Sequence, residues 1–322
     1  NFALSHMLQD QKASLSRFGV EFDVWFSERQ LVDSGAVSWV IDTLQERGMV
    51  YEAEGALWLR TTEFGDEKDR VLVKSDGNYT YLAGDIAYHK NKLDRGFDLL
   101  IDIWGPDHHG HVVPTRAGLQ ALGHPGSSLE VLLLQFLSLM SSGERVKMSK
   151  RAGEFVTMDD LIDEVGKDAA RYFLLMRNIE SHLEFDLALA KEESQANPVY
   201  YIQYAHARIC SIFRQAEERG IELSNLSEVD LSKLTEDAEL DIIRKLATYP
   251  DEVVISAEER APNRLAGYAL DLAGLFHSFY NSYRVINEDP DLTMARLALS
   301  EAVRTVLANV LGLLGIFAPH EM

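Results

Sequence analysis

Two apolar segments with a helical stretch between them constrain the fold of this chain most strongly. Residues 99–104 and 129–137 are largely apolar runs of the kind that form buried parallel strands, and residues 113–122 have the apolar spacing of a helix. Strand, helix and strand in this order predict a doubly wound sheet, in which ligands collect beyond the carboxyl ends of the strands. His108 and its neighbours follow the first strand, so we expect them at such an end.

The first part of the chain is expected to be mixed α/β. Its apolar residues alternate between helical and strand periodicity, and two glycine-containing turns mark hairpins that form an insertion between larger elements. The expected elements are helices over residues 4–18, 34–48 and 82–93, a short strand over residues 22–26, and hairpins that turn at Glu54-Gly55 and at Asp76-Gly77.

Strand patterns stop near Glu192, and long amphipathic helices follow. At 322 residues and 46% hydrophobic content, the chain is long enough for two domains that each have a core. We therefore predict an α/β domain over residues 1–190 and an all-α domain over residues 191–322. The helices of the second domain are expected over residues 197–219, 235–248, 262–287 and 291–314.

Composition argues against several classes of protein. No apolar run reaches the roughly 20 residues that cross a bilayer, so we expect a soluble protein without a membrane anchor. The single cysteine, Cys210, cannot form an internal disulfide, which suits the cytoplasm and excludes a zinc site built on cysteines. A formal net charge of −20 argues against nucleic-acid binding in general, although a binding face needs only local positive potential.

Two lysines flank a serine in a segment bounded by Gly143 and Gly153. The glycines supply backbone freedom, and the ammonium groups of Lys147 and Lys150 can stabilise charge that develops on a departing pyrophosphate. This pattern predicts a phosphate-binding loop and nucleotide chemistry. The alternative is a solvated basic turn, because lysines near glycines are common.

The tetrad Lys147-Met148-Ser149-Lys150 resembles the second signature of class I aminoacyl-tRNA synthetases. Its continuation into Arg151-Ala152-Gly153 resembles the arginyl-tRNA synthetase branch in particular. The resemblance implies that the tetrad binds ATP and that Lys147 and Lys150 are catalytic. It also implies the fold: part of a class I Rossmann-type nucleotide-binding catalytic domain, followed by a helical-bundle anticodon-binding domain.

Tyr81 and Asp85 lie four residues apart and so share one helical face. A carboxylate there can bind a guanidinium through two parallel hydrogen bonds, a geometry that the ammonium group of lysine cannot match. The alternative is an acidic residue near a helix N-terminus that stabilises the helix dipole. The resemblance to arginyl-tRNA synthetases implies that Tyr81 and Asp85 hold the arginine side chain.

Asp107, His108, His109 and His111 form an acceptable set of metal ligands. Adjacent side chains rarely converge on one ion, and no second group with metal spacing appears elsewhere, so we predict no metal site. A metal-dependent hydrolase that uses this cluster is the alternative. The resemblance implies that the cluster lines the substrate site, with His108 binding arginine and His111 binding ATP, and that it is not the first signature of the class.

The resemblance extends into the helical part. Residues 197–208 resemble the opening helix of the anticodon-binding bundle of arginyl-tRNA synthetases, and the last residues resemble the C-terminus of that family. Packing and solvated roles are the alternatives, because tyrosines on helices are often core residues. Tyr280 and Arg284 are expected on one helix. The tRNA contacts that the resemblance implies are Tyr204, Arg208, Tyr280, Arg284 and Met322.

These likenesses cover nearly all of the chain and identify it as a member of the arginyl-tRNA synthetase family. They imply an arginine-tRNA ligase that activates L-arginine with ATP, carried as its Mg²⁺ complex, and transfers the arginyl group to tRNA-Arg. They imply a cytoplasmic monomer with no tightly bound metal and no membrane partner. A non-catalytic tRNA-binding module is the second alternative.

The same alignment places the first signature and the small N-terminal tRNA-binding domain of the family before residue 1. The protein to which this chain belongs is therefore expected to be an enzyme. We expect the chain by itself to be inactive, or nearly so, in the activation of arginine.

Overall fold

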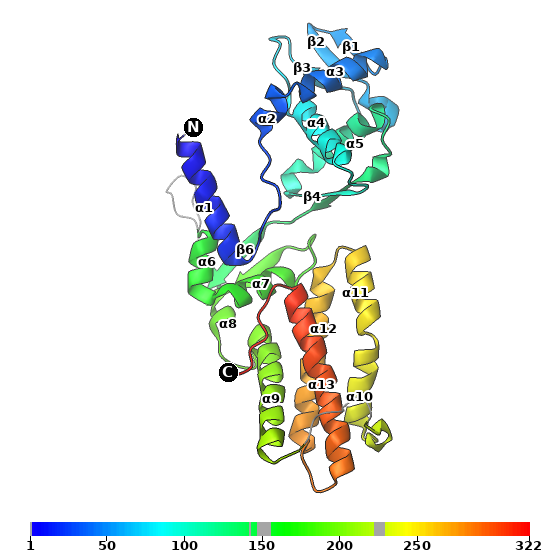
Figure 1. The fold of residues 1–322 in the computed structure, drawn as a ribbon. Helices are drawn as coiled ribbons and strands as arrows, with labels where there is room; N and C mark the ends of the chain where they lie inside the picture. The colour runs from blue at the N-terminus through cyan, green and yellow to red at the C-terminus, as the bar shows by residue number, and fades with distance from the viewer. Residues whose placement is uncertain (1, 142, 147–155, 222–228) are drawn as a thin grey trace. The chain divides into compact units, whose positions relative to one another are not determined.

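A computed structural model describes residues 2–141, 143–146, 156–221 and 229–322. The chain divides into two compact units (Figure 1). Phe22–Phe136 form one, here called the pocket unit, and Asn1–Glu21 together with Leu137–Met322 form the other, here called the bundle unit. Within the described ranges, no helix is long and apolar enough to cross a membrane.

Helices and short strands alternate along the pocket unit. One sheet is antiparallel in the order β1-β2-β3, and a parallel pair joins β4 to β5. The strands are β1 (Val50–Ala53), β2 (Ala56–Leu59), β3 (Arg70–Val73), β4 (Leu100–Trp104) and β5 (Leu129–Leu133). The helices are α2 (Glu28–Asp33), α3 (Ala36–Glu46), α4 (Tyr81–Asp94) and α5 (Val112–Ala121), with the 3-10 turns η1 (Thr61–Phe64), η2 (Pro106–His111) and η3 (Gly126–Ser128).

The predicted order of strand, helix and strand is confirmed. β4 and β5 run parallel in a register that pairs Leu100 with Leu129, and α5 connects them. These two leucines pack with Leu119 of α5 in a small core. The expectation that β4 is buried is wrong for one of its faces: Ile103 is 63% exposed, because the helices of this unit cover the Leu100 face.

α4 lies at the centre of the pocket unit. Leu82 and Ile86 recur at helical spacing and form a buried face that packs on α3, α5 and β3. Gly118 allows α5 to approach this face closely. A Cβ added at Gly118 would lie only 2.2 Å from Cδ1 of Ile86, so any larger residue would force the two helices apart.

The insertion is a hairpin extended by a third strand. β1 and β2 are joined by a two-residue turn in which Glu54 and Gly55 both have positive φ (53° and 72°). Hairpins favour this turn because its twist matches that of the flanking strands, and glycine adopts it readily. A second turn at Gly77 brings Tyr79 beside Val73. Both predicted turns are confirmed.

The strand predicted over residues 22–26 is wrong. The structure describes all five residues, none is in a strand, and Phe22 and Val24 are exposed. Alternating apolar and polar residues suggested a half-buried strand, but a strand needs a neighbour to satisfy its backbone hydrogen bonds. The segment leads into α2, a short helix that we did not predict, capped by the side chain of Ser27.

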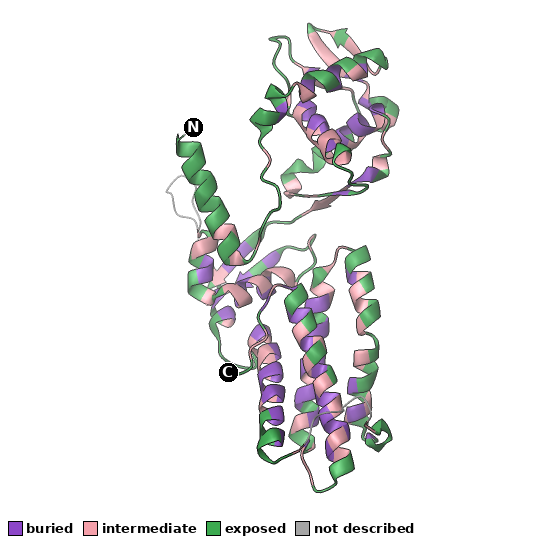
Figure 2. Cartoon of the chain, in the orientation of Figure 1, coloured by how far each residue is buried: buried purple, intermediate pink, exposed green. Residues whose placement is uncertain are grey.

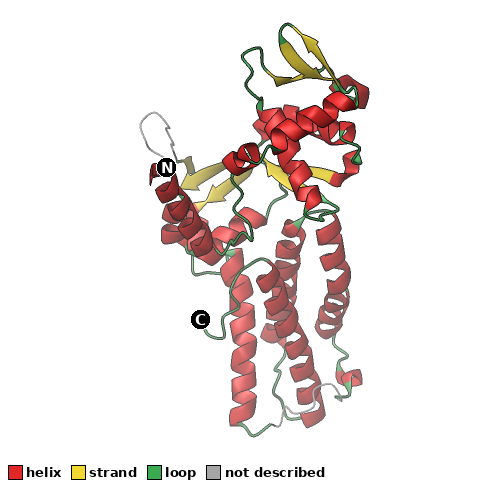
Figure 3. Ribbon diagram, turned by 45° about the horizontal axis from the view of Figure 1, so that its top comes forward, coloured by secondary structure: helices red, strands yellow, loops and turns green. Residues whose placement is uncertain are grey.

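The bundle unit combines a small sheet with long helices (Figure 3). The sheet has the order β7-β6-β8, and β6 runs parallel to β8. The strands are β6 (Leu137–Ser141), β7 (Glu144–Arg145) and β8 (Leu183–Asp186). The helices are α1 (Phe2–Phe18), α6 (Met158–Val165), α7 (Lys167–Leu175), α8 (Leu187–Lys191), α9 (Pro198–Glu218), η5 (Leu231–Lys233), α10 (Asp237–Ala247), α11 (Tyr249–Glu258), α12 (Pro262–Ser282) and α13 (Pro290–Leu313).

One continuous hydrophobic core joins this sheet to the long helices. It contains Phe185 of β8 together with Ile202 of α9 and Phe276 of α12. Tyr172 of α7 is also buried there, and its hydroxyl donates a hydrogen bond to the carbonyl of Ala266 in α12 (3.2 Å). The buried positions form stripes along α9, α12 and α13 (Figure 2), as expected for amphipathic helices in a bundle.

Side-chain caps determine where the bundle helices begin. Asn197 precedes Pro198, and its side chain accepts a hydrogen bond from the amide of Val199 (3.2 Å). Asp289 caps α13 in the same way, directly before Pro290. Proline is favourable at this position because the first amide of a helix has no partner within it. The helices then pack laterally, with α12 in contact with α9, α10, α11 and α13 (Figure 1).

The end of α12 differs from the prediction. This helix stops at Ser282, because Tyr283 is extended (φ −132°, ψ 141°). Tyr280 therefore lies on α12 and Arg284 beyond its end, so the prediction that they share one helix is wrong. The carbonyl of Arg284 accepts a hydrogen bond from Arg296 (2.9 Å), which holds the chain away from the helical path. The sequence analysis also missed α11.

We expect Gly118→Ala to destabilise the pocket unit by about 1 kcal/mol or more, because overpacking a filled interior outweighs the higher helix propensity of alanine. All four tryptophans lie in this unit, so tryptophan fluorescence during urea unfolding reports on it selectively. Gly84→Ala is the control: its added Cβ would meet only Oε1 of Glu28, at 3.9 Å. Unchanged urea midpoints in both variants would contradict the close packing of α4 on α5.

Candidate functional site

A pocket of about 510 Å³ lies at the carboxyl end of β4. Its walls come from the start of α4, the end of β4 and the turn η2 that follows. The structure therefore brings together Tyr81, Asp85, His108 and His111, which the sequence analysis selected from two separate segments. This β4 pocket is lined by Tyr81, Asp85, Ile103, Trp104, Gly105, His108 and His111.

α4 presents the two predicted side chains of the β4 pocket one turn apart. Tyr81 is the first residue of the helix and is 84% exposed, whereas Asp85 is half-buried. Burial raises the pKa of Asp85 above its ordinary value, and the positive charges of His89 and His111 oppose this only in part. In the described part of the chain, no hydrogen bond engages the Asp85 carboxylate. It is therefore a partly desolvated anion available to a cationic ligand.

η2 carries the two histidines of the β4 pocket. The ring centroids of His108 and His111 lie 5.8 Å apart with the rings tilted by 50°. Asp107 lies beside them, with Oδ2 at 3.7 Å from Nε2 of His108, and both side chains are exposed. Imidazole nitrogens in this position can donate or accept hydrogen bonds to a polar ligand in the pocket.

The cluster from Asp107 to His111 does not converge on one point. Nδ1 of His109 lies 3.3 Å from the carbonyl oxygen of Pro106. Among the described residues, which include this whole segment, no three His, Cys, Asp or Glu side chains are placed to hold a metal ion. The geometry gives no support to a metal-dependent hydrolase.

A polar network links the helical turn that carries Asp85 to β4. His89 is one turn further along α4, with Nδ1 at 2.6 Å from the carbonyl oxygen of Asp85 and Nε2 at 2.6 Å from Oδ2 of Asp102 on β4. Lys92 donates to Oδ1 of the same carboxylate (2.9 Å). Burial by itself raises the pKa of Asp102, but the hydrogen bonds from His89 and Lys92 outweigh it and lower the pKa to about 2.

The predicted phosphate-binding tetrad, Lys147-Met148-Ser149-Lys150, lies outside the described residues. Described elements flank it on both sides. Before it, β7 pairs with β6. After it, α6 begins with a capping box, in which the side chains of Thr157 and Asp160 each accept a hydrogen bond from the backbone amide of the other.

A cluster of one cation and several rings lies between α9 and α12. The guanidinium of Arg208 stacks over Tyr204 (4.5 Å to the ring centroid) and Tyr280 (4.8 Å). It also donates to the Tyr204 hydroxyl (3.0 Å) and to Nδ1 of His277 (3.1 Å). Burial lowers the pKa of His277 and the charge of Arg208 lowers it further, so His277 is neutral and can accept this bond. The structure thus brings together three of the predicted tRNA-binding residues.

A second pocket, of about 460 Å³, lies at the end of α12. This α12 pocket is bordered by Arg219, which directly follows α9, and by residues 280–286, which include Tyr280 and Arg284. Arg284 is exposed and Tyr280 is half-buried. Two guanidinium groups therefore border one hollow, which supplies local positive charge on a chain whose formal net charge is −20.

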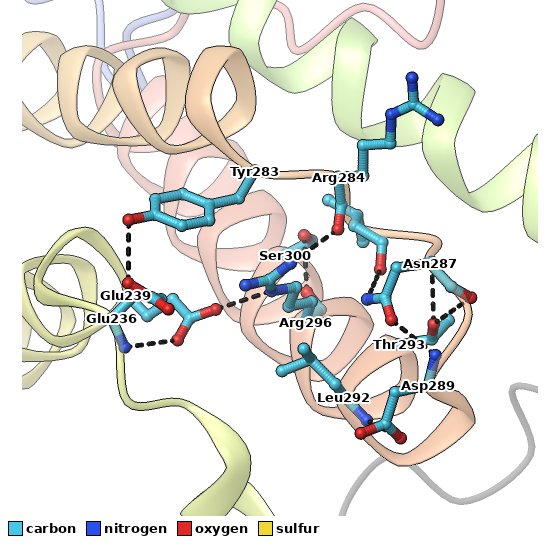
Figure 4. A network of polar contacts seen from close by, with 11 residues as sticks. Glu236, Glu239, Tyr283, Arg284, Asn287, Asp289, Leu292, Thr293, Arg296 and Ser300 are labelled. Atoms are coloured by element: carbon cyan, nitrogen blue, oxygen red, sulfur yellow. Dashed lines mark hydrogen bonds and ion pairs between the residues drawn. The ribbon is translucent and has the colours of Figure 1, made fainter.

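Figure 4 shows the network that places Arg284. Arg296 of α13 donates through Nε to Oε1 of Glu239 on α10 (2.7 Å) and through a terminal nitrogen to the carbonyl of Arg284 (2.9 Å). Glu239 is 0% exposed and Arg296 is also buried. The hydroxyl of Tyr283 donates to Glu236 (3.0 Å), and the Arg296 guanidinium lies 5.2 Å from the Tyr283 ring centroid. The segment after α12 is thus anchored on a buried ion pair, while the Arg284 side chain points away from the network.

The C-terminal tail lies along α9 and is held by its backbone. Three side chains of α9 donate hydrogen bonds to three carbonyls of the tail. Met322 follows this anchored stretch and is 52% exposed, but it is not among the residues that line the α12 pocket. The hydrogen bonds that hold the tail run from the Gln203 side chain to the Phe317 carbonyl (2.8 Å), from His206 to the Pro319 carbonyl (2.8 Å) and from Arg214 to the His320 carbonyl (3.2 Å).

Sequence reasoning missed the residues that support these sites. Asp102 interrupts the apolar run of β4, and Arg296 interrupts the apolar positions of α13. A buried charge needs a partner, so each interruption is a usable signal. The partners, His89 and Glu239, lie on other elements, and a single sequence does not show which elements pack together. Arg219 carries no local signal.

Known proteins share both parts of this chain. Residues 3–207 match the family described as tRNA synthetases class I (R), catalytic domain, and residues 202–322 match the DALR anticodon binding domain. The chain therefore belongs to the class I tRNA synthetase family, with a catalytic domain followed by a helical anticodon-binding domain. The predicted fold class is confirmed.

The relatives place the chain in the arginyl branch of that family, as the lysine tetrad indicated. It is 54% identical to the arginine–tRNA ligase of Desulforamulus reducens and 52% identical to that of Caldanaerobacter subterraneus subsp. tengcongensis, over 100% of this chain and 57% of each relative. It thus spans little more than half the length of these relatives. A Campylobacter jejuni crystal structure provisionally described as an arginyl-tRNA synthetase superposes with a TM-score of 0.91 at 36% identity, covering 100% of this chain and 69% of that one. Thermus thermophilus arginyl-tRNA synthetase shares the fold, with a TM-score of 0.83 at 23% identity, covering 99% and 64%.

We expect Glu239→Gln to destabilise the bundle unit by about 3 kcal/mol, because it leaves the buried Arg296 without an opposite charge. Asp241→Asn on the same helix is the control, since its exposed pair with Arg244 contributes about 0.5 kcal/mol or less. Thermal unfolding followed by far-ultraviolet circular dichroism measures both, and tryptophan fluorescence shows that the pocket unit is unaffected. Equal melting temperatures for the two variants would contradict the role of the ion pair.

Proposed function

We propose that the protein to which this chain belongs is an arginine-tRNA ligase, and that the β4 pocket binds the side chain of L-arginine. The observation that carries this proposal is the half-buried carboxylate of Asp85, which has no hydrogen-bond partner among the described residues and lines the pocket at the carboxyl end of β4. Membership of the arginyl branch supports it. A non-catalytic tRNA-binding relative would have no use for such a carboxylate.

Arginine suits this pocket for a geometric reason. A guanidinium is planar and presents paired N–H donors that match the two oxygens of a carboxylate, so Asp85 can bind it through two parallel hydrogen bonds. Tyr81 stands one helical turn away and offers a ring face and a hydroxyl. His108 is proposed to contact arginine from η2, and His111 to contact ATP.

The proposed reaction has two steps. A carboxylate oxygen of arginine attacks the α-phosphorus of ATP, supplied as its Mg²⁺ complex, and the bond from that phosphorus to the pyrophosphate oxygen breaks. A ribose hydroxyl at the 3′ end of tRNA-Arg then attacks the arginyl carbonyl and releases AMP. Lys147 and Lys150 are proposed to stabilise charge on the departing pyrophosphate, with Met148 and Ser149 in the same ATP-binding segment.

We further propose a functional division near residue 190. Residues 1–190 would contribute to the catalytic domain, and residues 191–322 would bind the anticodon part of tRNA-Arg. The cluster around Arg208, the α12 pocket and the exposed Met322 supply the proposed RNA-binding groups, since stacked rings and guanidiniums are common in RNA recognition. Monomeric state and cytoplasmic location complete the proposal.

The arginine site is tested by isothermal titration of the chain with L-arginine. We expect Asp85→Asn to weaken binding by about 10- to 100-fold, because a charge-assisted pair contributes about 1.5–3 kcal/mol. Because binding needs the ionised carboxylate, wild-type affinity should fall as pH decreases through the raised pKa of Asp85. Asp94→Asn, on the same helix but in an exposed pair with Lys90, is the control and should bind normally. Equal affinity in all three proteins would exclude the β4 pocket as the arginine site.

The RNA-binding surface is tested by titrating the chain with a tRNA-Arg transcript and with one altered only in the anticodon, at several salt concentrations. We expect the altered transcript to bind more weakly. Arg284→Ala should reduce affinity for the unaltered transcript about tenfold, whereas Arg244→Ala, on exposed α10 surface, should not. Equal binding of both transcripts would argue against an anticodon-specific surface.

A further inference from the structure

We propose that His89 is a positioning residue for Asp85: as a cation between the Asp85 carbonyl and the Asp102 carboxylate, it fixes the first turns of α4 and keeps Asp85 ionised for a guanidinium. The inference rests on the proposed role of Asp85 in arginine binding. His89 lies outside the lining of the β4 pocket and is 3% exposed, so it acts through Asp85 and not on the ligand.

The two contacts of the ring require two hydrogens. A neutral imidazole has one donor and one acceptor nitrogen, whereas a protonated ring has two donors. The carbonyl oxygen of Asp85 can only accept, so Nδ1 carries a hydrogen. Asp102 is an ionised carboxylate that can also only accept, so Nε2 carries one as well. The ring between them is therefore an imidazolium.

The charges of His89, Lys92 and Asp102 do not cancel. Asp102 contributes one negative charge, and it is in contact with two cations, His89 and Lys92 (2.6 and 2.9 Å). Lys92 is itself held over the ring of Tyr88 (4.5 Å to the centroid). The three groups together carry one net positive charge, and the charge of His89, whose ring contacts the Asp85 carbonyl, lowers the pKa of Asp85. This charge offsets part of the cost of keeping a half-buried carboxylate ionised.

The ring also fixes the backbone. In a helix the carbonyl of Asp85 accepts from the amide of His89, and here Nδ1 of the same residue approaches that oxygen a second time (2.6 Å). Through Nε2 the same ring reaches β4. The turn that carries Asp85 is thus tied to the strand whose end forms the opposite wall of the pocket.

Some charged groups around Asp85 raise its pKa and others lower it. Glu28 of α2 and Asp102 of β4 raise the pKa of Asp85, whereas His89 on its own helix and His111 of η2 lower it. Burial is the largest influence and raises it. Without the His89 charge, His111 is the remaining group of these four that lowers the pKa of Asp85.

The test is the pH dependence of L-arginine affinity, measured by isothermal titration of the full chain from pH 5 to 8. Arginine binding is lost as pH falls through the pKa of Asp85. In His89→Gln we expect this midpoint to move up by about one pH unit or more, since a close opposite charge shifts a carboxylate by that amount. His124→Gln, the same substitution after α5, should leave the midpoint unchanged.

A second measurement uses the wild-type chain, so its outcome does not depend on whether a variant folds. The ¹⁵N shifts of the His89 ring in the wild-type chain at pH 7.5 should be those of an imidazolium at both nitrogens. Neutral-ring shifts would overturn the inference, as would an affinity loss in His89→Gln that is equal at every pH. If wild-type and Asp85→Asn bind arginine equally, the proposed function fails and this inference with it. If only Asp85→Asn loses binding and the midpoint of His89→Gln does not move, this inference alone fails.

Discussion

The arrangement of the bundle unit depends on how α7 is held. Its Tyr172 is buried with the hydroxyl on a carbonyl of α12, and the neighbouring Arg171 donates to the carbonyls of Phe18 and Leu314 (3.0 and 2.8 Å). One short helix thus contacts the end of α1, the body of α12 and the end of α13. In a close-packed interior, a shift of α7 would break these hydrogen bonds together. The helices that follow the lysine tetrad and the helices proposed to bind RNA are therefore one packed body.

Local pattern predicted the elements whose fold is decided locally. The helix around Ile86, the parallel strands on either side of α5 and the turn at Gly55 were found from spacing and turn chemistry alone. The strand expected over residues 22–26 was wrong because pairing depends on a distant partner. The end of α12 was misplaced because Arg296, on the next helix, takes the carbonyl of Arg284. In both cases the deciding contact comes from another element, which sequence periodicity does not show.

The candidate sites follow the same division. Tyr81 and Asp85 could be found because they share a helical face, and His111 because it follows a strand end. The positioning role of His89 could not be found in this way, because its contact with Asp102 exists only when α4 lies against β4. The lysine tetrad was the strongest local signal, and it lies outside the described residues. The comparisons support its family assignment, and its geometry stays a prediction.

Hydrogen bonds from side chains of α9 to main-chain carbonyls hold the C-terminal tail in place. Gln203, His206 and Arg214 bind carbonyl oxygens of the tail, and two of its side chains add to these contacts: Ile316 is buried in the core, and Glu321 pairs with Arg214 (3.6 Å). Met322 follows these contacts and is 52% exposed, so its side chain contributes little to the stability of the bundle unit. Such an exposed position can change with little loss of stability, so the RNA contact proposed for Met322 could diverge while the bundle unit keeps its fold.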